Sequence, residues 1–363
     1  MKLFLIAGEA SGDLHGSNLI KALKAQQPNI DCQAWGGDLM AEAGATVLKH
    51  YRELAFMGFV EVLLNLRTIL RNIAICKAQI LSYQPDALLL IDYPGFNLRI
   101  AKWAKKQGIP VIYYISPQIW AWHQSRVHDI RRDVDKMLVI LPFEQAFYQK
   151  YGVETTYVGH PLLDAIQSLK TAEAIPTNTG KKIIALLPGS RAQEVKKMLP
   201  KMLSVSTDYP DYQFVIAGTQ NLALDFYQTF LADYPHVQLI QGQTYAILKS
   251  ATAALVKSGT STLEAALFDV PQVVCYAGNP VSYHIAKWVI QVKYISLVNL
   301  IADKPMVREL IQGELNRENL SIALQDILDP AKAANLKSEY ADLRKLLGEG
   351  GASSRAAAAI LKL

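Results

Sequence analysis

The sequence predicts a doubly wound α/β protein built from two domains, and two observations lead to this prediction. Short apolar runs alternate with helical patterns along the whole of the 363 residues. The runs are nearly continuous in Leu, Ile and Val, which is typical of strands buried on both faces of a parallel sheet. The order strand, glycine turn and helix that opens the chain also recurs after a polar stretch at 171–182, which we interpret as a linker. We therefore expect two Rossmann-like domains that face each other across a cleft.

The order of the elements follows from the same apolar runs. Strands are predicted at 3–7, 87–91, 111–115 and 137–141 in the first half, and at 183–187, 214–217 and 272–277 in the second. We expect a first domain at 1–172, a second domain at 173–345 and a C-terminal segment at 346–363. This last segment has a glycine break followed by an Ala-rich helix, whose side chains are too small for it to fold alone.

Composition and charge exclude some classes of function. The net charge of +5 comes from basic residues spread along the chain, so an anionic substrate or membrane surface is favoured over nucleic acid. The three cysteines, Cys32, Cys76 and Cys275, form no CxxC pair, which suits a reducing cytoplasm and predicts no metal site. The chain has no run of eighteen apolar residues, and its first apolar stretch is too short for a signal peptide.

The two strand-to-helix turns that open the domains differ in charge. The first, GEASGD at 8–13, carries Glu9 and Asp13, which would repel a phosphate. The second, LPGSR at 187–191, combines Gly189, Ser190 and Arg191 with the free N–H groups of a helix start, which suits a diphosphate. We therefore expect the acidic turn to face hydroxyl groups and the basic turn to bind phosphate. Helix-start capping is the alternative for the two acids, and the chain contains neither GxGxxG nor a P-loop.

Asp92 follows directly after the apolar run ALLLI. In open α/β sheets the carboxyl ends of the strands border the binding crevice. An Asp at this place, beside apolar neighbours, could accept a proton from a substrate hydroxyl. The alternative is an Asp that caps the loop before Tyr-Pro-Gly. Asn97 could support Asp92 or cap a helix.

A run of small hydroxyl residues at 258–267, SGTSTLEAAL, marks a second predicted phosphate site. Ser258, Gly259, Thr260 and Ser261 could offer hydroxyls and backbone N–H groups to phosphate oxygens. Glu264, one helical turn later, could hold both hydroxyls of a ribose. The same spacing also fits a capping box without any ligand.

Other residues have two interpretations each. His160, shortly before the linker, could reach the cleft or be structural. Trp120 and Trp122 could pack in the core or form an apolar wall for a substrate. The DVD sequence at 133–135 resembles a metal motif of some glycosyltransferases, but its basic neighbours lead us to interpret it as chance.

The stretch at 56–73 is more apolar than one core-facing stripe requires. Its apolar stripe consists of Phe59, Leu63, Leu66, Leu70 and Ile73, and its polar stripe of Glu61, Asn65, Thr68 and Asn72. Arg67 and Arg71 flank the apolar arc, as in a helix that lies on anionic lipid. The predicted membrane contacts are Phe56, Phe59, Val60, Leu63, Leu66 and Leu70. A buried helix of the first domain is the alternative.

Taken together, the motifs resemble those of the lipid-A-disaccharide synthase family, in the same order and over nearly the whole chain. They are GEASGD at 8–13, DYPGFN at 92–97, SPQIWAW at 116–122, GHPL at 159–162, LPGSR at 187–191, SGTSTLE at 258–264 and SLVNLIADK at 296–304. The Tyr-Pro-Gly after Asp92 is a small departure that leaves the Asp in place. The resemblance implies a GT-B glycosyltransferase that inverts the anomeric centre without a metal or other cofactor. It also implies a C-terminal segment that crosses back onto the first domain or swaps between subunits.

The resemblance further implies substrates and roles. The donor would be UDP-2,3-diacylglucosamine, the acceptor 2,3-diacylglucosamine 1-phosphate (lipid X), and the products the β-1,6-linked disaccharide 1-phosphate and UDP. Asp92 would be the general base and Glu9 a second essential acid, while Arg191 would hold the diphosphate, Glu264 the ribose and Asn299 the donor pocket. The family context implies a peripheral protein on the cytoplasmic face of the inner membrane of a Gram-negative bacterium, and it allows a homodimer. Two alternatives are a UDP-GlcNAc 2-epimerase-like enzyme and a non-catalytic nucleotide-sugar-binding module.

Overall fold

The computed structural model describes residues 1–54, 66–168, 175, 180–278 and 292–362. The chain divides into two compact units, each with its own parallel sheet. The first unit contains Met1–Asp164 and Glu349–Leu363, and the second contains Ala165–Gly348. The chain thus changes unit at Asp164 and at Gly348, where the sequence analysis expected boundaries at 172 and 345.

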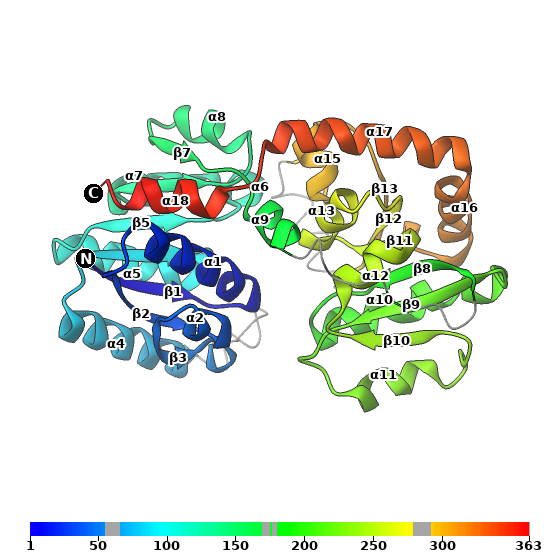
Figure 1. The fold of residues 1–363 in the computed structure, drawn as a ribbon, viewed down its shortest axis with the longest axis horizontal. Coiled ribbons are helices and arrows are strands. Elements are labelled where there is room, and N and C mark those ends of the chain that lie inside the picture. Colours follow the sequence, from blue (N-terminus) through cyan, green and yellow to red (C-terminus); the bar gives the residue numbers. More distant parts are fainter. Residues whose placement is uncertain (55–65, 169–174, 176–179, 279–291, 363) are drawn as a thin grey trace. The chain divides into compact units, whose positions relative to one another are not determined.

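The first unit is a seven-stranded parallel sheet in the order β3-β2-β1-β4-β5-β6-β7 (Figure 1). Its strands are β1 (Lys2–Ala7), β2 (Asp31–Gly36), β3 (Thr46–His50), β4 (Ala87–Ile91), β5 (Val111–Tyr114), β6 (Lys136–Val139) and β7 (Thr155–Tyr157). Its helices are α1 (Ala10–Gln26), α2 (Asp38–Glu42), α4 (Leu66–Tyr83), α5 (Pro94–Lys106), α6 (Ile119–Trp122), α7 (Val127–Asp133), α8 (Glu144–Gln149) and α18 (Ala352–Ile360), and α9 (Pro161–Ser168) leads into the second unit. One face of the sheet packs on α4, α5 and α7 around Phe4, Leu88 and Tyr113, while α1 packs against α18.

The second unit is a six-stranded parallel sheet in the order β10-β9-β8-β11-β12-β13. Its strands are β8 (Lys182–Leu187), β9 (Tyr212–Gly218), β10 (Gln238–Gln241), β11 (Ala251–Lys257), β12 (Gln272–Tyr276) and β13 (Arg308–Ile311). Its helices are α10 (Ala192–Leu203), α11 (Leu224–Leu231), α12 (Thr244–Ser250), α13 (Thr260–Leu267), α15 (Leu297–Ala302), α16 (Arg317–Leu328) and α17 (Pro330–Leu347). Ile184 and Leu186 join the core on one face of β8, and Ile183 and Ala185 join the core on the other. A strand buried on both faces explains the unbroken apolar run.

The prediction of two doubly wound domains is confirmed, because each sheet is parallel and carries helices on both faces. Every predicted strand exists, although several strands were not predicted. The order is the same in both units: the first strand lies between the second and the fourth. In each unit the connections therefore reverse direction between these two strands, β1 and β4 in one and β8 and β11 in the other.

The C-terminal segment belongs to the first unit of its own chain. Ala352, Ala356 and Ala357 of α18 are completely buried, and α18 packs along α1 (Figure 1). The carboxylate of Asp164 accepts hydrogen bonds from the N–H groups of Gly351 (2.5 Å), Ala352 (3.2 Å) and Ser353 (2.8 Å). An acid at the start of a helix satisfies donors that have no partner within the helix. The small alanines allow the two helices to approach closely.

Helix α4 corrects the stripe that the sequence analysis proposed for 56–73. Ile73 is buried in the core of the first unit, whereas Leu70 is 55% exposed. The face of α4 that packs inward contains Ile69, Ile73, Cys76 and Ile80. The proposed stripe therefore combined residues from two faces of the helix. None of the described helices is long and apolar enough to cross a membrane.

Candidate functional site

Several of the predicted functional residues lie at the crossover point of each sheet. Glu9 follows β1 and Asp92 follows β4, and these two strands are neighbours whose last pair is Ala7 with Ile91. In the second unit, Gly189 to Arg191 follow β8 and Ser258 follows β11, which are again neighbours. Ligands bind at this place in open α/β sheets, because the loops diverge there and leave a crevice.

Asp92 and Glu9 interact electrostatically at the crossover of the first unit. Burial and, to a smaller extent, the negative charge of Glu9 together raise the pKa of Asp92 to about 7, against the opposing effect of the Tyr93 N–H. Both residues are partly exposed. A carboxyl group with a pKa near 7 can hold and release a proton at neutral pH, as a general base must.

The backbone around Asp92 is strained in a way that fixes its position. Asp92 (φ 45°) and Tyr93 (φ 51°) are consecutive non-glycine residues in the left-handed region, each at a typical cost of about 1–3 kcal/mol. The carbonyl of Asp92 accepts hydrogen bonds from the amide of Asn97 (2.7 Å) and the hydroxyl of Tyr113 (2.6 Å). Both donors come from the rigid interior, since Asn97 and Tyr113 are completely buried. They hold the turn that presents the Asp92 carboxylate.

Gly8 is required by the same turn. A Cβ atom at Gly8 would lie 2.4 Å from ring carbons of Tyr93. The ring is held in place by its hydroxyl, which donates to the carbonyl of Leu54 (3.1 Å), and by stacking on Phe96. The absence of a side chain at Gly8 therefore lets the loops after β1 and β4 approach each other.

The other acid of the first turn, Asp13, has a structural role. It is 3% exposed, and its carboxylate accepts hydrogen bonds from the N–H groups of Gly37 (2.8 Å), Leu39 (3.2 Å) and Met40 (3.1 Å). These N–H groups lie at the start of α2. Asp13 therefore caps a helix, as the alternative interpretation proposed, but the capped helix is α2 and not α1, which contains Asp13. Asp13 is thus engaged with α2, whereas contact of Glu9 with a substrate hydroxyl stays a prediction.

The basic turn of the second unit contains an acid that the sequence analysis missed. The carboxylate of Glu194 accepts hydrogen bonds from the N–H of Ser190 (3.2 Å), the guanidinium of Arg191 (3.4 Å) and the ammonium of Lys257 (2.9 Å). Gly189 has φ +111°, and a Cβ atom there would lie 2.6 Å from Glu194 Oε2. Burial alone would raise the pKa of Glu194, but Lys257, Arg191 and the Ser190 N–H together hold that pKa below its usual value.

A cavity of about 230 Å³ opens beside this cluster. It is lined by Gln193, Glu194, Lys197, Met198, Lys257, Tyr276, Ala277 and Gly278. Four of these residues lie on the first two turns of α10, and the others lie at or just after the ends of β11 and β12, so the cavity lies at the carboxyl edge of the second sheet. Its position and its cations suit an anionic group.

The hydroxyl run at 258–267 is only partly directed toward a ligand. Ser258 donates to the carbonyl of Ile295 (2.8 Å), and Thr262 donates to the carbonyl of Gly259 (2.8 Å). Thr260 is exposed and Ser261 is partly exposed. The Glu264 carboxylate accepts a hydrogen bond from Tyr245 (3.1 Å), and burial raises its pKa. The contacts of Ser258, Gly259, Thr260, Ser261 and Glu264 with a nucleotide stay a prediction.

Asn299 holds its own loop together. It is 1% exposed, and its amide nitrogen donates to the carbonyl of Val307 and to the carboxylate of Glu309, both at 2.9 Å. Its amide oxygen accepts from the N–H of Val307 (2.9 Å). The described contacts of Asn299 thus tie α15 to β13, and a contact with the donor stays a prediction.

His160 is buried in the first unit. It is 3% exposed, and its Nδ1 accepts a hydrogen bond from the N–H of Leu162 (3.2 Å). Burial and, to a smaller extent, His15 together lower the pKa of His160 to about 3, against the opposing effect of Asp164. The imidazole is therefore neutral at neutral pH, and its contact with a substrate stays a prediction. Trp120 is also 6% exposed and donates to Glu144 (3.2 Å), which favours core packing over a substrate wall.

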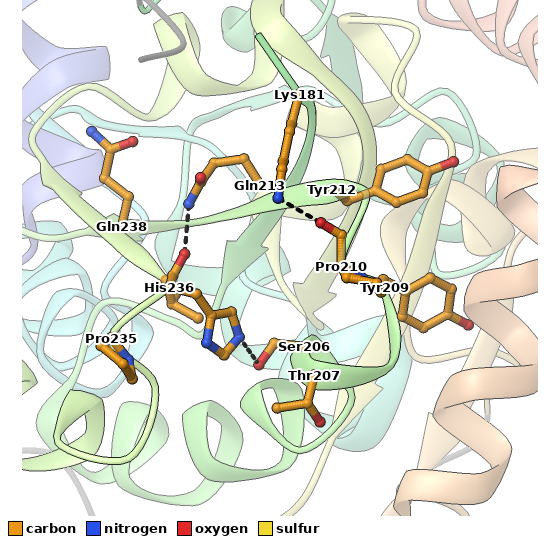
Figure 2. A pocket seen from close by; sticks show the side chains of 11 residues that line it. Lys181, Ser206, Thr207, Tyr209, Pro210, Tyr212, Gln213, Pro235, His236 and Gln238 are labelled. Carbon is orange, nitrogen blue, oxygen red and sulfur yellow. Dashed lines mark hydrogen bonds between the residues drawn. The ribbon is translucent and has the colours of Figure 1, made fainter. Parts of the chain in front are cut away.

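The larger cavity of the second unit contains none of the predicted residues. It measures about 760 Å³ and lies beside the amino-terminal ends of β8, β9 and β10. Figure 2 shows its lining, in which His236 bonds Ser206 (3.0 Å) and Lys181 bonds the carbonyl of Pro210 (2.6 Å). Parallel sheets bind ligands at the opposite edge. We therefore assign the chemistry to the smaller cavity.

Four of the predicted membrane contacts, Phe56, Phe59, Val60 and Leu63, lie outside the described residues. Leu66 begins α4, and Leu70 lies exposed between the exposed Arg67 and Arg71. Contact of these residues with a membrane therefore stays a prediction.

Comparison with known proteins identifies the relatives of the chain. The family model described as lipid-A-disaccharide synthetase matches residues 3–362. The lipid-A-disaccharide synthase of Syntrophus aciditrophicus is 41% identical, over 99% of this chain and 97% of that protein. The corresponding synthase of Geobacter sulfurreducens is 37% identical, over 100% of this chain and 97% of that protein.

Solved structures share the two-domain fold at low identity. A UDP-GlcNAc 2-epimerase from Neisseria meningitidis bound to UDP-GlcNAc superposes with a TM-score of 0.72 at 14% identity, over 100% of both chains. The glycosyltransferase of kitacinnamycin superposes with a TM-score of 0.66 at 17% identity, over 99% of this chain and 98% of that chain. At these identities the likeness concerns the fold alone, and it confirms the GT-B fold class.

Proposed function

The chain belongs to the lipid-A-disaccharide synthetase family, and we propose that it transfers a diacylglucosamine residue from UDP-2,3-diacylglucosamine to 2,3-diacylglucosamine 1-phosphate. The products are the β-1,6-linked disaccharide 1-phosphate and UDP. The observation that carries the detailed proposal is the carboxyl group of Asp92, with its pKa near 7, beside Glu9 at a sheet crossover.

In the proposed reaction Asp92 accepts the proton of the acceptor 6-hydroxyl. The oxygen attacks C1 of the donor sugar from the face opposite the diphosphate, a C1–O bond forms, and the bond to UDP breaks with its electron pair. This single displacement inverts the anomeric centre. Burial and, to a smaller extent, the charge of Glu9 keep the pKa of Asp92 high, so that the carboxylate is basic enough to take a hydroxyl proton.

The second unit stabilises the leaving group. In the proposal, the diphosphate of UDP lies at the start of α10, where Arg191 and the backbone N–H groups balance its charge. Glu264 holds the ribose hydroxyls, and Gly189 and Ser190 bring the backbone close to the phosphates. Stabilising the charge that develops on a leaving group is usually among the largest contributions to catalysis.

We also propose that the protein works at the cytoplasmic face of the inner membrane, because both substrates carry acyl chains. Support comes from α4, where Leu70 (55% exposed) and Leu81 (51% exposed) are eleven positions apart and so point outward on the same side. Leu70→Ser should reduce cosedimentation with anionic vesicles. Leu346→Ser, which replaces a 51% exposed leucine of the second unit, is the matched control. Equal binding of both variants to the vesicles would contradict the proposal that this surface of α4 contacts the membrane.

The function is tested by incubating the protein with UDP-2,3-diacylglucosamine and lipid X and measuring both the disaccharide and the released UDP. We expect both products in equal amounts, and none when lipid X is left out. In a parallel reaction UDP-GlcNAc is offered as the substrate, because the structural neighbours include epimerases. Epimerisation of UDP-GlcNAc without disaccharide synthesis would overturn the proposal.

A further inference from the structure

We propose that Lys257 is a second cation for the diphosphate of the donor, and that the carboxylate of Glu194 competes with the diphosphate for the same donors. The inference rests on the proposed function, since it names further residues of the nucleotide site. Neither residue was predicted from a motif. Both line the 230 Å³ cavity at the carboxyl edge of the second sheet.

The contacts of Glu194 identify the hydrogen-bond donors that are present for an anion at the start of α10. Its two oxygens bond a backbone N–H at the start of α10 (Ser190, 3.2 Å), a guanidinium (Arg191, 3.4 Å) and an ammonium (Lys257, 2.9 Å). Helix-start N–H groups, Arg and Lys are also the donors that proteins use for phosphate oxygens. The carboxylate thus occupies a set of donors that suits a phosphate.

The position of Lys257 explains how it would reach the diphosphate. It is the last residue of β11, next to β8, and β8 leads into the turn with Gly189. The ammonium therefore approaches the start of α10 from the neighbouring strand, while Arg191 approaches from the turn itself. Two cations on two adjacent loops can bind two phosphates of one ligand.

The Glu194 carboxylate has opposite effects on this site. It keeps the two cations from repelling each other, but a diphosphate placed among them meets a negative charge within the same cluster. Like charges in close contact are unfavourable. Binding of the diphosphate then requires Glu194 to give up at least part of its contacts with Lys257 and Arg191.

A purely structural ion pair makes a different prediction. If Lys257 and Glu194 only stabilised the fold, replacing either one would affect UDP binding in the same direction or not at all. Competition predicts opposite signs for the two partners. Gln is the suitable replacement for Glu194 because it removes the charge and keeps an oxygen that can accept from Lys257 and Ser190.

The experiment is calorimetry of UDP and of uridine on the full chain, with the variants Lys257→Met, Lys257→Arg and Glu194→Gln. Lys196→Met is the control for net charge, because Lys196 lies exposed on α10 and does not line the cavity. We expect Lys257→Met to weaken UDP about ten- to hundredfold, as for a lost charge-assisted contact. Uridine should bind almost unchanged, and Lys257→Arg should retain most of the affinity for UDP. Glu194→Gln should bind UDP severalfold more tightly than the wild type.

The possible results distinguish a failure of this inference from a failure of the proposed function. A Lys257→Met variant that binds UDP as well as Lys196→Met does would overturn the role of Lys257. A Glu194→Gln variant that binds UDP more weakly would overturn the competition and favour a structural ion pair. Failure of the wild type to bind UDP would instead refute the proposed function. Thermal unfolding of each variant checks that the second unit is folded.

Discussion

Replacing Asp92 by Asn tests the proposed base in two independent ways, because it should lower turnover and raise stability. Turnover should fall by about 10²–10⁴, the usual contribution of a general base. The fold should tolerate the change, since the left-handed backbone of Asp92 (φ 45°) is a conformation that Asn adopts as readily as Asp. The buried partners of its carbonyl, Asn97 and Tyr113, are unaffected.

The sign of the stability change follows from the pKa of Asp92. The ordinary value is 3.8, and burial followed by the charge of Glu9 raises it to about 7 in the folded protein. Between pH 4 and pH 7 the folded chain keeps a proton that the unfolded chain has lost, so wild-type stability falls as the pH rises. Asn has no such proton. The stability gained by Asp92→Asn should therefore grow from pH 4 to pH 7 and stay constant above.

The magnitude has an upper limit on the order of 4 kcal/mol, at 1.36 kcal/mol for each pKa unit. Solvent screening of the partly exposed carboxylate reduces this to roughly 1–2 kcal/mol. For a unit of this size each kcal/mol shifts the Tm by about 2–4 °C, so we expect a gain of several degrees at pH 8 and less at pH 5. Glu144, whose pKa burial also raises to about 7, is present in both proteins and cancels in the difference.

Tryptophan fluorescence during thermal unfolding is the appropriate measurement, because four of the five tryptophans, Trp35, Trp103, Trp120 and Trp122, belong to the first unit. Wild type and Asp92→Asn are compared at pH 5 and at pH 8, alongside turnover with both substrates. A Tm difference that does not grow between these pH values would refute the raised pKa. Near wild-type turnover would remove Asp92 from the mechanism.

Three further substitutions test the rest of the site and the C-terminal helix. Glu9→Gln should lower the pKa of Asp92 and move the acidic limb of the kcat/KM profile to lower pH, and an unmoved limb would contradict their coupling. Arg191→Ala should weaken UDP by about ten- to hundredfold and uridine far less in calorimetry, whereas equal losses would exclude a diphosphate contact. Asp164→Ala should cost about 1–2 kcal/mol and speed proteolysis of α18, because three N–H groups lose their acceptor; unchanged cleavage would refute this anchoring role.

The apolar runs predicted the fold because parallel strands are buried on both faces, and β11 shows where this signal fails. Its sequence, ATAALVK, begins with small residues that have weak strand propensity, although the strand lies between β8 and β12 at the centre of the sheet. Small side chains are useful there because helices pack on both sides. Propensity reflects the residue alone, whereas the position of β11 depends on its neighbours in space.

The same limit applies to the functional residues. Asp92 was predicted because a charged residue ended a buried strand, and Lys257 would have been found by the same rule if β11 had been recognised. Asp13 could not be assigned from its motif, because Gly37, the N-cap of the helix that it caps, lies 24 positions later in the chain. Glu194 has the spacing of a helix-start acid, but its contact with Lys257 joins residues 63 positions apart. The spacing of residues in the sequence predicts contacts within one helix or turn, whereas Asp13 and Glu194 contact residues that are distant in the sequence.

The two units place charges of opposite sign at equivalent positions of the same sheet order. At or just after the carboxyl ends of the first and fourth strands, the first unit carries Glu9 and Asp92, and the second carries Arg191 and Lys257. Two like charges on neighbouring loops repel each other, and each unit reduces this repulsion differently. In the first unit the pKa of Asp92 rises to about 7, so a proton can neutralise one of the acids. In the second unit arginine cannot lose its proton at any ordinary pH, and Glu194 supplies a counter-charge instead. In our proposal each arrangement serves its half of the reaction, since a loosely held proton site suits a base and a displaceable carboxylate suits a diphosphate.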